Sequence, residues 1–401
     1  MLLSIPVIWM ITEYLRAWIF SIVTWGKGAL LGPFWTFSHL GYILADTPIF
    51  YLSRSIGLYG LSFIVAMMNV IIFLLIKNGK LKIIILLLMI FFGVSYFYVH
   101  LFSKENHIDS QSSIKVMLLS IPASDASFYR EGFLKILDDE KITSDNQPNI
   151  VLFPEGLSFL SLYGELERPV LEKIFPNQER NGYVIANKMS FTERGRISEI
   201  VYRDQKGNLI KRQEKNFLIP AGEVLPLGLK IFSKIIHAEN NIKSFSANRE
   251  LASGAGNKAV SLGKMKIGAF LCSELLSPLF SRLLVNDGAQ IIFNSSSHSL
   301  WRGNQRLDRE LELMARFVAM SNKRYFLQST FDGPIYAINT RGFIFQKFFG
   351  QLPSISLVAA GLENSKTLTT RTGDTPIILS GLLVLVIFIY HSRRFRSLDP
   401  K

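Results

Sequence analysis

The hydrophobic pattern of the chain divides it into apolar ends and a mixed middle. Two apolar runs, 57–76 and 83–102, contain no Asp, Glu, Lys or Arg, and each is long enough for a helix that spans a bilayer. A third apolar run begins at Thr375 and is followed by arginines near the C-terminus. The pattern therefore predicts a membrane hairpin and, over 375–401, a C-terminal transmembrane helix with a basic cytoplasmic tail.

The first apolar stretch, predicted as a span at about 2–24, differs from the others because Glu13 and Arg16 interrupt it. Their i, i+3 spacing places both side chains on one helix face, which predicts a structural ion pair or a lining for lipid entry. Basic residues also crowd the connection 77–82 and the C-terminal tail, and both are therefore expected in the cytoplasm. Residues 1–103 thus form the predicted N-terminal membrane region.

The middle of the chain, 104–374, is consequently expected outside the cytoplasm. It alternates strand-like apolar runs with amphipathic helical patterns, which is typical of a layered α/β fold. A stretch rich in Gly, Ser and Asn, 244–263, is predicted to be a surface loop or a support for a flexible lid. The predicted strands are 115–121, 149–154, 182–187, 197–203, 266–271, 289–294, 324–330 and 335–339. The predicted helices are 127–140, 165–175, 278–286 and 304–321.

The composition narrows the classes of function. The chain has 44 Lys and Arg against 31 Asp and Glu, a formal charge of +13. Basic residues beside apolar segments serve topology and anionic lipids, and no groove-reading motif is present, so no nucleic-acid partner is expected. The single cysteine, Cys272, excludes an internal disulfide and a multi-cysteine metal site. The sequence also lacks G-x-S-x-G, P-loop and H-E-x-x-H motifs, and we expect neither metal nor cofactor.

Three residues stand where chemistry is expected. Glu155 follows the predicted strand 149–154, and Cys272 follows the predicted strand 266–271. In open α/β sheets, functional groups collect at the carboxyl ends of strands. Lys215 lies between them in the chain, so a carboxylate, an amine and a thiol can supply base, oxyanion stabilisation and nucleophile. The alternative for the thiol is inert burial as a small hydrophobic side chain.

These motifs resemble a known family. Phe-Pro-Glu at 153–155, Lys-x7-Glu from Lys215 and Cys-x-Glu at 272–274 resemble the Glu–Lys–Cys set of the nitrilase, or carbon–nitrogen hydrolase, superfamily. Three further segments resemble its apolipoprotein N-acyltransferase branch and not the soluble nitrilases; they are 12–18, 41–46 and 371–374. The resemblance implies an αββα sandwich flanked by transmembrane α-helices, on the periplasmic side of the cell inner membrane.

The resemblance also assigns roles by position. It makes Glu155 the general base, Lys215 the oxyanion-stabilising lysine and Cys272 the nucleophile, with Glu223 and Glu274 as supporting glutamates. Residues expected to form a lid or to contact substrate are Leu157, Phe159, Ser273 and Asn294. A Cys–His dyad through His298 is the weaker alternative, because a glutamate base already has a place in the set.

The implied reaction moves a fatty acyl chain from a membrane phospholipid, through a Cys thioester, to the N-terminal amine of a diacylated apolipoprotein. The family usually has further spanning helices ahead of the segment that resembles 12–18. We therefore expect a short variant or a split gene product, acting as a monomer or with a separate subunit that supplies those helices. Two alternatives remain open, a membrane-anchored amidase or hydrolase and a catalytically impaired binder of lipid or lipoprotein.

Overall fold

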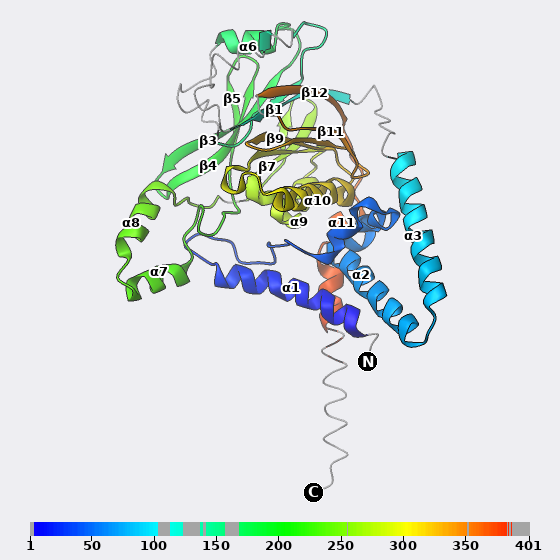
Figure 1. Cartoon of the computed structure of the whole chain (residues 1–401). Helices are drawn as coiled ribbons and strands as arrows, with labels where there is room; N and C mark the ends of the chain where they lie inside the picture. The colour runs from blue at the N-terminus through cyan, green and yellow to red at the C-terminus, as the bar shows by residue number, and fades with distance from the viewer. Residues whose placement is uncertain are drawn as a thin grey trace.

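A large β-sheet forms the centre of the computed structural model, with helices on its outer faces and apolar helices gathered at one end (Figure 1). The structure describes 4–102, 113–122, 137–138, 142–156, 168–254, 256–350, 353–382, 384 and 386. The main path of hydrogen-bonded strands is β5 (Leu209–Glu214), β4 (Gly195–Asp204), β3 (Tyr183–Thr192), β2 (Ile150–Leu152), β1 (Ser113–Ile121), β9 (Phe326–Phe331), β8 (Ile291–Ser297), β7 (Met265–Leu271) and β6 (Val260–Leu262).

Three further strands attach to this path. β12 (Ser354–Gly361) pairs with β1, β10 (Ile335–Ile338) pairs with β9, and β11 (Ile344–Phe348) pairs with β10, all antiparallel. From β3 through β7 along the path, neighbouring strands are parallel. Parallel strands bring their carboxyl ends to the same edge of a sheet, so the residues that follow β2 and β7 lie at one end of the molecule.

The two halves of the sheet pack face to face. Val116 and Leu118 of β1 belong to a buried cluster that also contains Ala269 of β7, whereas Met117 and Leu119 belong to a second cluster beneath α6. This alternation follows from the two-residue period of a strand whose two faces are both buried. The predicted α/β fold with a nitrilase-like layering is therefore confirmed.

Most predicted elements are present. α9 (Pro278–Asn286) has the expected bounds, α10 (Gln305–Asn322) is displaced by one residue, and α6 (Arg168–Ile174) covers part of the expected helix. Helix 127–140 lies outside the described residues except at 137–138. Each of the eight predicted strands overlaps an observed one. The pattern missed β5, β6, β11 and β12 and the helices α7 (Leu227–Ile235) and α8 (Glu239–Asn248).

Helices also occupy the predicted N-terminal membrane region. They are α1 (Ile5–Val23), α2 (Ser53–Lys77) and α3 (Leu81–Phe102), with the short 3-10 helices η2 (Leu40–Asp46) and η3 (Pro48–Leu52) between the first two. By length and composition, two helices of the described chain could cross a membrane, Ile5–Val23 and Pro48–Lys77, and Leu81–Phe97 is a shorter apolar helix. The helices are thus confirmed, and their crossing of a bilayer stays a prediction.

A connection between α1 and η2 packs directly against the α/β layers. The Thr36 hydroxyl donates to the Leu276 carbonyl oxygen at 2.8 Å, and the Phe34 ring lies 5.5 Å from the Phe217 ring, centroid to centroid. Leu276 ends the 3-10 helix η6 (Cys272–Leu276) that begins at the cysteine, and Phe217 lies two residues after Lys215. The apolar end of the molecule is therefore in contact with both segments that carry the candidate chemistry.

Candidate active site

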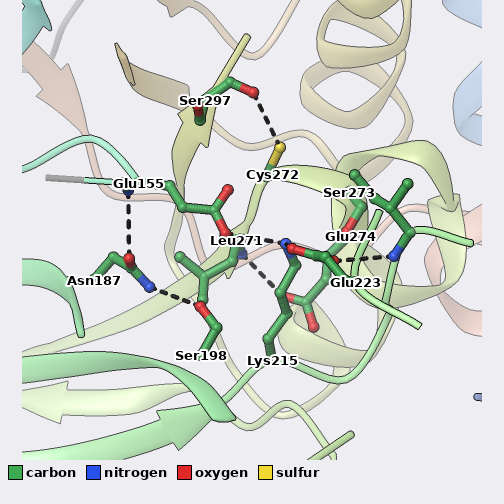
Figure 2. Close-up of polar contacts among 12 residues, drawn as sticks. Glu155, Asn187, Ser198, Lys215, Glu223, Leu271, Cys272, Ser273, Glu274 and Ser297 are labelled. Carbon is green, nitrogen blue, oxygen red and sulfur yellow. Dashed lines mark hydrogen bonds and ion pairs between the residues drawn. The ribbon is translucent and has the colours of Figure 1, made fainter. Parts of the chain in front are cut away.

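Glu155, Lys215 and Cys272 converge at the carboxyl ends of β2, β5 and β7 (Figure 2). The Lys215 ammonium lies between two carboxylates, with Nζ 3.0 Å from Glu155 Oε1 and 2.6 Å from Glu223 Oε1. The Lys215 side chain is fully buried, whereas the two glutamate side chains are 12% and 17% exposed. A buried cation needs such partners, because an unpaired charge in the interior costs several kcal/mol.

Burial and neighbouring charge set the protonation states of this cluster. Burial raises the pKa of Glu155, the charge of Glu223 raises it further, and Lys215 opposes both effects. Burial alone would lower the pKa of Lys215, but the two carboxylates outweigh it and the net shift is upward. Burial and the Glu155 charge raise the pKa of the Cys272 thiol to about 12, against the opposing charge of Lys215. The resting site thus holds a neutral thiol beside a cationic lysine.

The cysteine occupies a sharp turn between β7 and η6. Its φ of +41° lies in the left-handed region, which costs a non-glycine residue about 1–3 kcal/mol. Such a conformation persists only where the surrounding structure enforces it. Its thiol donates to the Ser297 carbonyl oxygen at the end of β8, with Sγ and O 3.5 Å apart. Because a neutral thiol is a weak nucleophile, this position requires a nearby base, and the Glu155 carboxylate is close enough to shift the thiol pKa.

Glu223 is held by the backbone of the turn that follows Lys215. Its Oε2 accepts from the Ile219 N–H at 2.9 Å, while Oε1 faces the ammonium. The turn depends on Ala221, whose φ is +60°, and it closes with a hydrogen bond from the Ala221 N–H to the Val224 carbonyl oxygen. The chain therefore places the second carboxylate eight residues after the lysine without a regular element between them.

Glu274 supports the site through the backbone. Its carboxylate accepts from the Asn216 N–H and from the Leu271 N–H, both at 2.9 Å, and it is 1% exposed. These two N–H groups flank Lys215 and Cys272, so one side chain ties the lysine segment to the cysteine turn. Burial raises the pKa of Glu274, although hydrogen bonds from Asn216, Leu271 and Asn257 oppose that shift.

Glu274→Ala is expected to lower the free energy of unfolding by about 2–5 kcal/mol, because two buried N–H groups lose their acceptor and each costs about 1–3 kcal/mol unpaired. Thermal unfolding of the purified protein in detergent measures the effect. Glu274→Gln retains an acceptor oxygen and should be intermediate, and the exposed Glu179→Ala should change nothing. Equal unfolding temperatures for Glu274→Ala and Glu179→Ala would contradict this role.

The other predicted site residues are distributed differently. The Ser273 hydroxyl donates to the Phe217 carbonyl oxygen at 2.6 Å, which adds a second link between the two segments. Asn294 is completely buried and its amide donates to Gln328 at 2.8 Å, in a polar network of β8 and β9. The expected lid residues Leu157 and Phe159 lie outside the described residues.

His298 has its own partner. Its Nδ1 lies 2.9 Å from Asp308 Oδ1 of α10, and the ring is buried against Trp301. This pairing supports the choice of Glu155 over a Cys–His dyad. In the part of the chain that the structure describes, no group of three or more His, Cys, Asp or Glu side chains is arranged to hold a metal ion.

Three asparagines at the site were missed by the sequence reasoning. Asn187 of β3 accepts from the Gly156 N–H at 3.4 Å and donates to the Ser198 hydroxyl at 2.8 Å, beneath the Glu155 turn (Figure 2). Asn216 is hydrogen bonded to Asn257, which is itself buried against Glu274. The only available signal was the adjacency of Asn216 to Lys215, since asparagine is ordinarily a turn or surface residue.

The position of Asn257 also corrects an expectation for 244–263. This stretch is not one surface loop, because it contains the end of α8, the buried Asn257 and strand β6. Its backbone is bound to the site, with Gly254 N–H donating to the Lys215 carbonyl oxygen at 2.9 Å. Its Gly and Asn content reflects close packing around the lysine segment and not an exposed connection.

An apolar cavity of the described chain lies elsewhere. It has a volume of about 620 Å³ and is lined mainly by apolar residues of α1, α2 and the start of the C-terminal helix. None of Glu155, Lys215 and Cys272 lines it. This cavity and the Glu155–Lys215–Cys272 cluster are therefore separate places in the molecule.

Comparison with known proteins agrees with this geometry. The family model "Carbon-nitrogen hydrolase" matches residues 140–333, a range that holds all three residues of the cluster. An apolipoprotein N-acyltransferase from Geobacter metallireducens is 24% identical over 366 residues, 86% of this chain and 65% of that protein. Residues 140–333, just under half of the chain, thus resemble the carbon–nitrogen hydrolase superfamily. Within it, the chain resembles the apolipoprotein N-acyltransferases.

Two further comparisons define the extent of this likeness. The apolipoprotein N-acyltransferase of Aquifex aeolicus is 24% identical over 52% of this chain and 44% of its own length. The chain thus spans at most 65% of the length of these two relatives. Among solved structures, an amidase from Nesterenkonia sp. is similar with a TM-score of 0.45 and 14% identity, covering 64% of this chain and 93% of the amidase.

Proposed function

We propose that this protein is an N-acyltransferase that moves a fatty acyl chain from a phospholipid to the N-terminal amine of a diacylated apolipoprotein. One observation carries the proposal. The only thiol of the chain lies beside a buried lysine held between Glu155 and Glu223, in a site whose flanking segments pack against apolar helices. The likeness to apolipoprotein N-acyltransferases supports the choice of donor and acceptor.

In the first half-reaction, Glu155 accepts the Cys272 proton as the sulfur attacks the ester carbonyl carbon of the phospholipid. The carbonyl oxygen becomes an oxyanion, and the adjacent Lys215 ammonium stabilises this charge. The carbon–oxygen bond to the glycerol then breaks, and Glu155 returns the proton to the departing lysophospholipid. An acyl thioester on Cys272 remains.

In the second half-reaction, the neutral α-amine of the apolipoprotein attacks the thioester carbonyl carbon. Glu155 accepts a proton from the amine, the carbon–sulfur bond breaks, and Glu155 gives the proton to the sulfur. This step forms the amide and regenerates the thiol. Lys215 keeps its proton in both halves, since two carboxylates face its ammonium.

The proposal includes a location. Donor and acceptor are both lipids or lipid-anchored, so a site held beside the bilayer meets them at high effective concentration. We place the protein in the inner membrane as a multi-pass protein with the α/β layers on the periplasmic side, as the distribution of basic residues suggests. Phospholipid and diacylated apolipoprotein are its proposed partners.

Mass spectrometry tests the reaction. Purified protein in detergent is incubated with phosphatidylethanolamine and a synthetic diacylated lipopeptide, and both the protein and the peptide are then weighed. An acyl adduct on Cys272 together with an N-acylated peptide is expected. An adduct that gives only free fatty acid would identify a hydrolase, and the absence of any adduct would identify a binding protein; either outcome overturns the proposal.

The rate of adduct formation is expected to fall in acid. Glu155 accepts a proton only when ionised, and burial raises its pKa above the ordinary value of 4.5. The rate should therefore decline as the pH falls through that raised pKa, at a pH above 4.5, and Glu155→Gln should be slow at every pH. Single-turnover rates between pH 4 and 9 measure this. A wild-type profile parallel to that of Glu155→Gln would exclude Glu155 as the base.

A further inference from the structure

A two-helix arm projects from the loop that carries Glu223. It consists of α7 and α8, and the Leu251 N–H at its far end donates to the Glu223 carbonyl oxygen at 2.7 Å. Both ends of the arm therefore lie near the backbone of Glu223, whose carboxylate pairs with Lys215. Figure 1 shows the arm beside one end of α1, on the side of the molecule where the apolar helices lie.

α7 exposes its apolar face and turns its polar face inward. Its one buried side chain is Ser233, and Lys230 is paired with Glu250 at 2.7 Å. At 100° per residue the exposed apolar side chains of 227–236 cover an arc of about 200°, with Lys230, Ser233 and Lys234 on the remainder. These side chains are between 44% and 69% exposed, and they are Leu227, Leu229, Ile231, Phe232, Ile235 and Ile236. A helix that faces water has the reverse arrangement.

The start of α7 is joined by its backbone to the residues that follow α1. The Leu227 N–H donates to the Trp25 carbonyl oxygen at 2.7 Å, and Gly26 pairs with Pro226 in a β-bridge. The contact is close, since a Cβ at Gly26 would lie 2.5 Å from the Leu225 carbonyl oxygen. The end of α1 is itself apolar and exposed, with Val23 68% accessible. Exposed apolar side chains therefore lie both on α7 and at the end of α1, and the backbone contacts hold these two segments together.

We propose that α7 is an interfacial helix that lies in the surface of a phospholipid bilayer and holds the Glu223–Lys215 cluster at that surface. Several bulky apolar side chains with a lysine at the edge of the arc are typical of such helices. Lys234 is exposed there, where it can meet anionic head groups. The contact with lipid stands independently of the reaction, and only its consequence for catalysis rests on the proposed function.

The single native cysteine makes the lipid contact measurable in the full chain. In a Cys272→Ala background, Ile231→Cys, Ile235→Cys and Lys206→Cys are labelled one at a time with an environment-sensitive fluorophore. Lys206 lies in the turn between β4 and β5, at the end of the sheet opposite the cluster. The labelled proteins are placed in nanodiscs of phosphatidylethanolamine and phosphatidylglycerol with a share of lipid that carries a nitroxide near its head group.

Strong quenching is expected at 231 and 235 and none at 206. Quenching at 231 and 235 no greater than at 206 would overturn the proposal. So would quenching that depends on a second labelled copy of the chain instead of the lipid nitroxide, because α7 would then be a contact between copies. These readouts do not require the protein to transfer acyl groups.

A triple variant tests the catalytic consequence. Ile231→Ser, Phe232→Ser and Ile235→Ser together should slow acyl transfer from nanodisc phospholipid about tenfold, because burial of such side chains in the interface is lost. Alkylation of Cys272 by iodoacetamide should keep its rate, since the cluster itself is intact. The matched control is Leu209→Ser with Ile210→Ser, which removes exposed apolar side chains beside the 206 turn.

The outcomes separate two failures. Two results would overturn α7 as the membrane contact of the site. One is a triple variant that loses both acyl transfer and alkylation of Cys272, and the other is equal slowing of acyl transfer in the Leu209/Ile210 control. Absence of acyl transfer by the wild-type protein, together with quenching in the variants labelled at 231 and 235, would overturn the proposed function and leave the interfacial helix standing.

Discussion

Lys215→Met is expected to reduce formation of the Cys272 acyl adduct by about a hundredfold to a thousandfold, the usual effect of losing one donor to an oxyanion. The substitution also leaves Glu155 and Glu223 without the cation between them. Lys215 lowers the pKa of Glu155 and the Glu223 charge raises it, so removal of the cation should raise the pKa of Glu155 further. Glu155 would then be a poor base as well, and both effects act in the same direction.

Single-turnover adduct formation, followed by mass spectrometry, measures the loss. Lys211→Met is the matched control, because Lys211 is exposed on β5 only four residues earlier and touches none of the cluster. A second variant, Lys215→Arg, keeps the charge but cannot keep the geometry of both carboxylate contacts and should also be slow. A Lys215→Met protein that forms adduct at the wild-type rate would remove the lysine from the mechanism.

Cys272→Ala is expected to abolish the adduct, the N-acylated peptide and any released fatty acid. No other cysteine exists in the chain to take its place. The folded state should be little affected, because the hydrogen bond from the thiol to the Ser297 carbonyl oxygen is long, at 3.5 Å. Intact-protein mass spectrometry and thermal unfolding of the same sample separate loss of chemistry from loss of fold.

Cys272→Ser refines this result. The serine hydroxyl has a much higher pKa than a thiol and is a poorer leaving group from the acyl enzyme, so slow formation of a long-lived oxygen ester is expected. Persistence of N-acylated peptide in the alanine variant would show that transfer does not pass through residue 272.

Two of the four strands that the sequence missed, β5 and β6, lie at the ends of the main strand path. β5 carries Lys211, Arg212 and Glu214, and its side chains are largely exposed because it lies at one edge of the sheet. β6 has only three residues and lies at the other edge. Neither strand is buried on both faces, so neither leaves the apolar run that identified β1, β7 or β8. The hydrophobic pattern therefore predicts the central strands of such a sheet and does not predict exposed edge strands.

α7 was missed for a related reason. Its apolar residues follow a helical arc, but they mark a surface that faces outward and not a core. From the sequence alone, an apolar arc would be interpreted as a face packed on the core. The pairing of Lys230 with Glu250 and the burial of Ser233 show instead that the other side of the helix faces the protein. The same contacts are the basis of the interfacial role.

Some residues of the site could be predicted from the sequence, and others could not. Glu155, Lys215 and Cys272 could be found because each follows a recognisable local motif, and the structure brings them together as that order implies. The backbone role of Glu274 could not be found. Its two acceptor contacts join Asn216 to Leu271 across 55 positions of the sequence. No local motif around any of these residues predicts that they are in contact.

By itself, the sequence determined the apolar helices, the α/β layering and the three reactive side chains, because these depend on periodicity and on residues next to strand ends. The tertiary structure alone decided the cation between two carboxylates, the raised pKa of the thiol and the outward face of α7. Those properties arise from burial and from distances between segments far apart in the chain, and a one-dimensional pattern contains neither quantity.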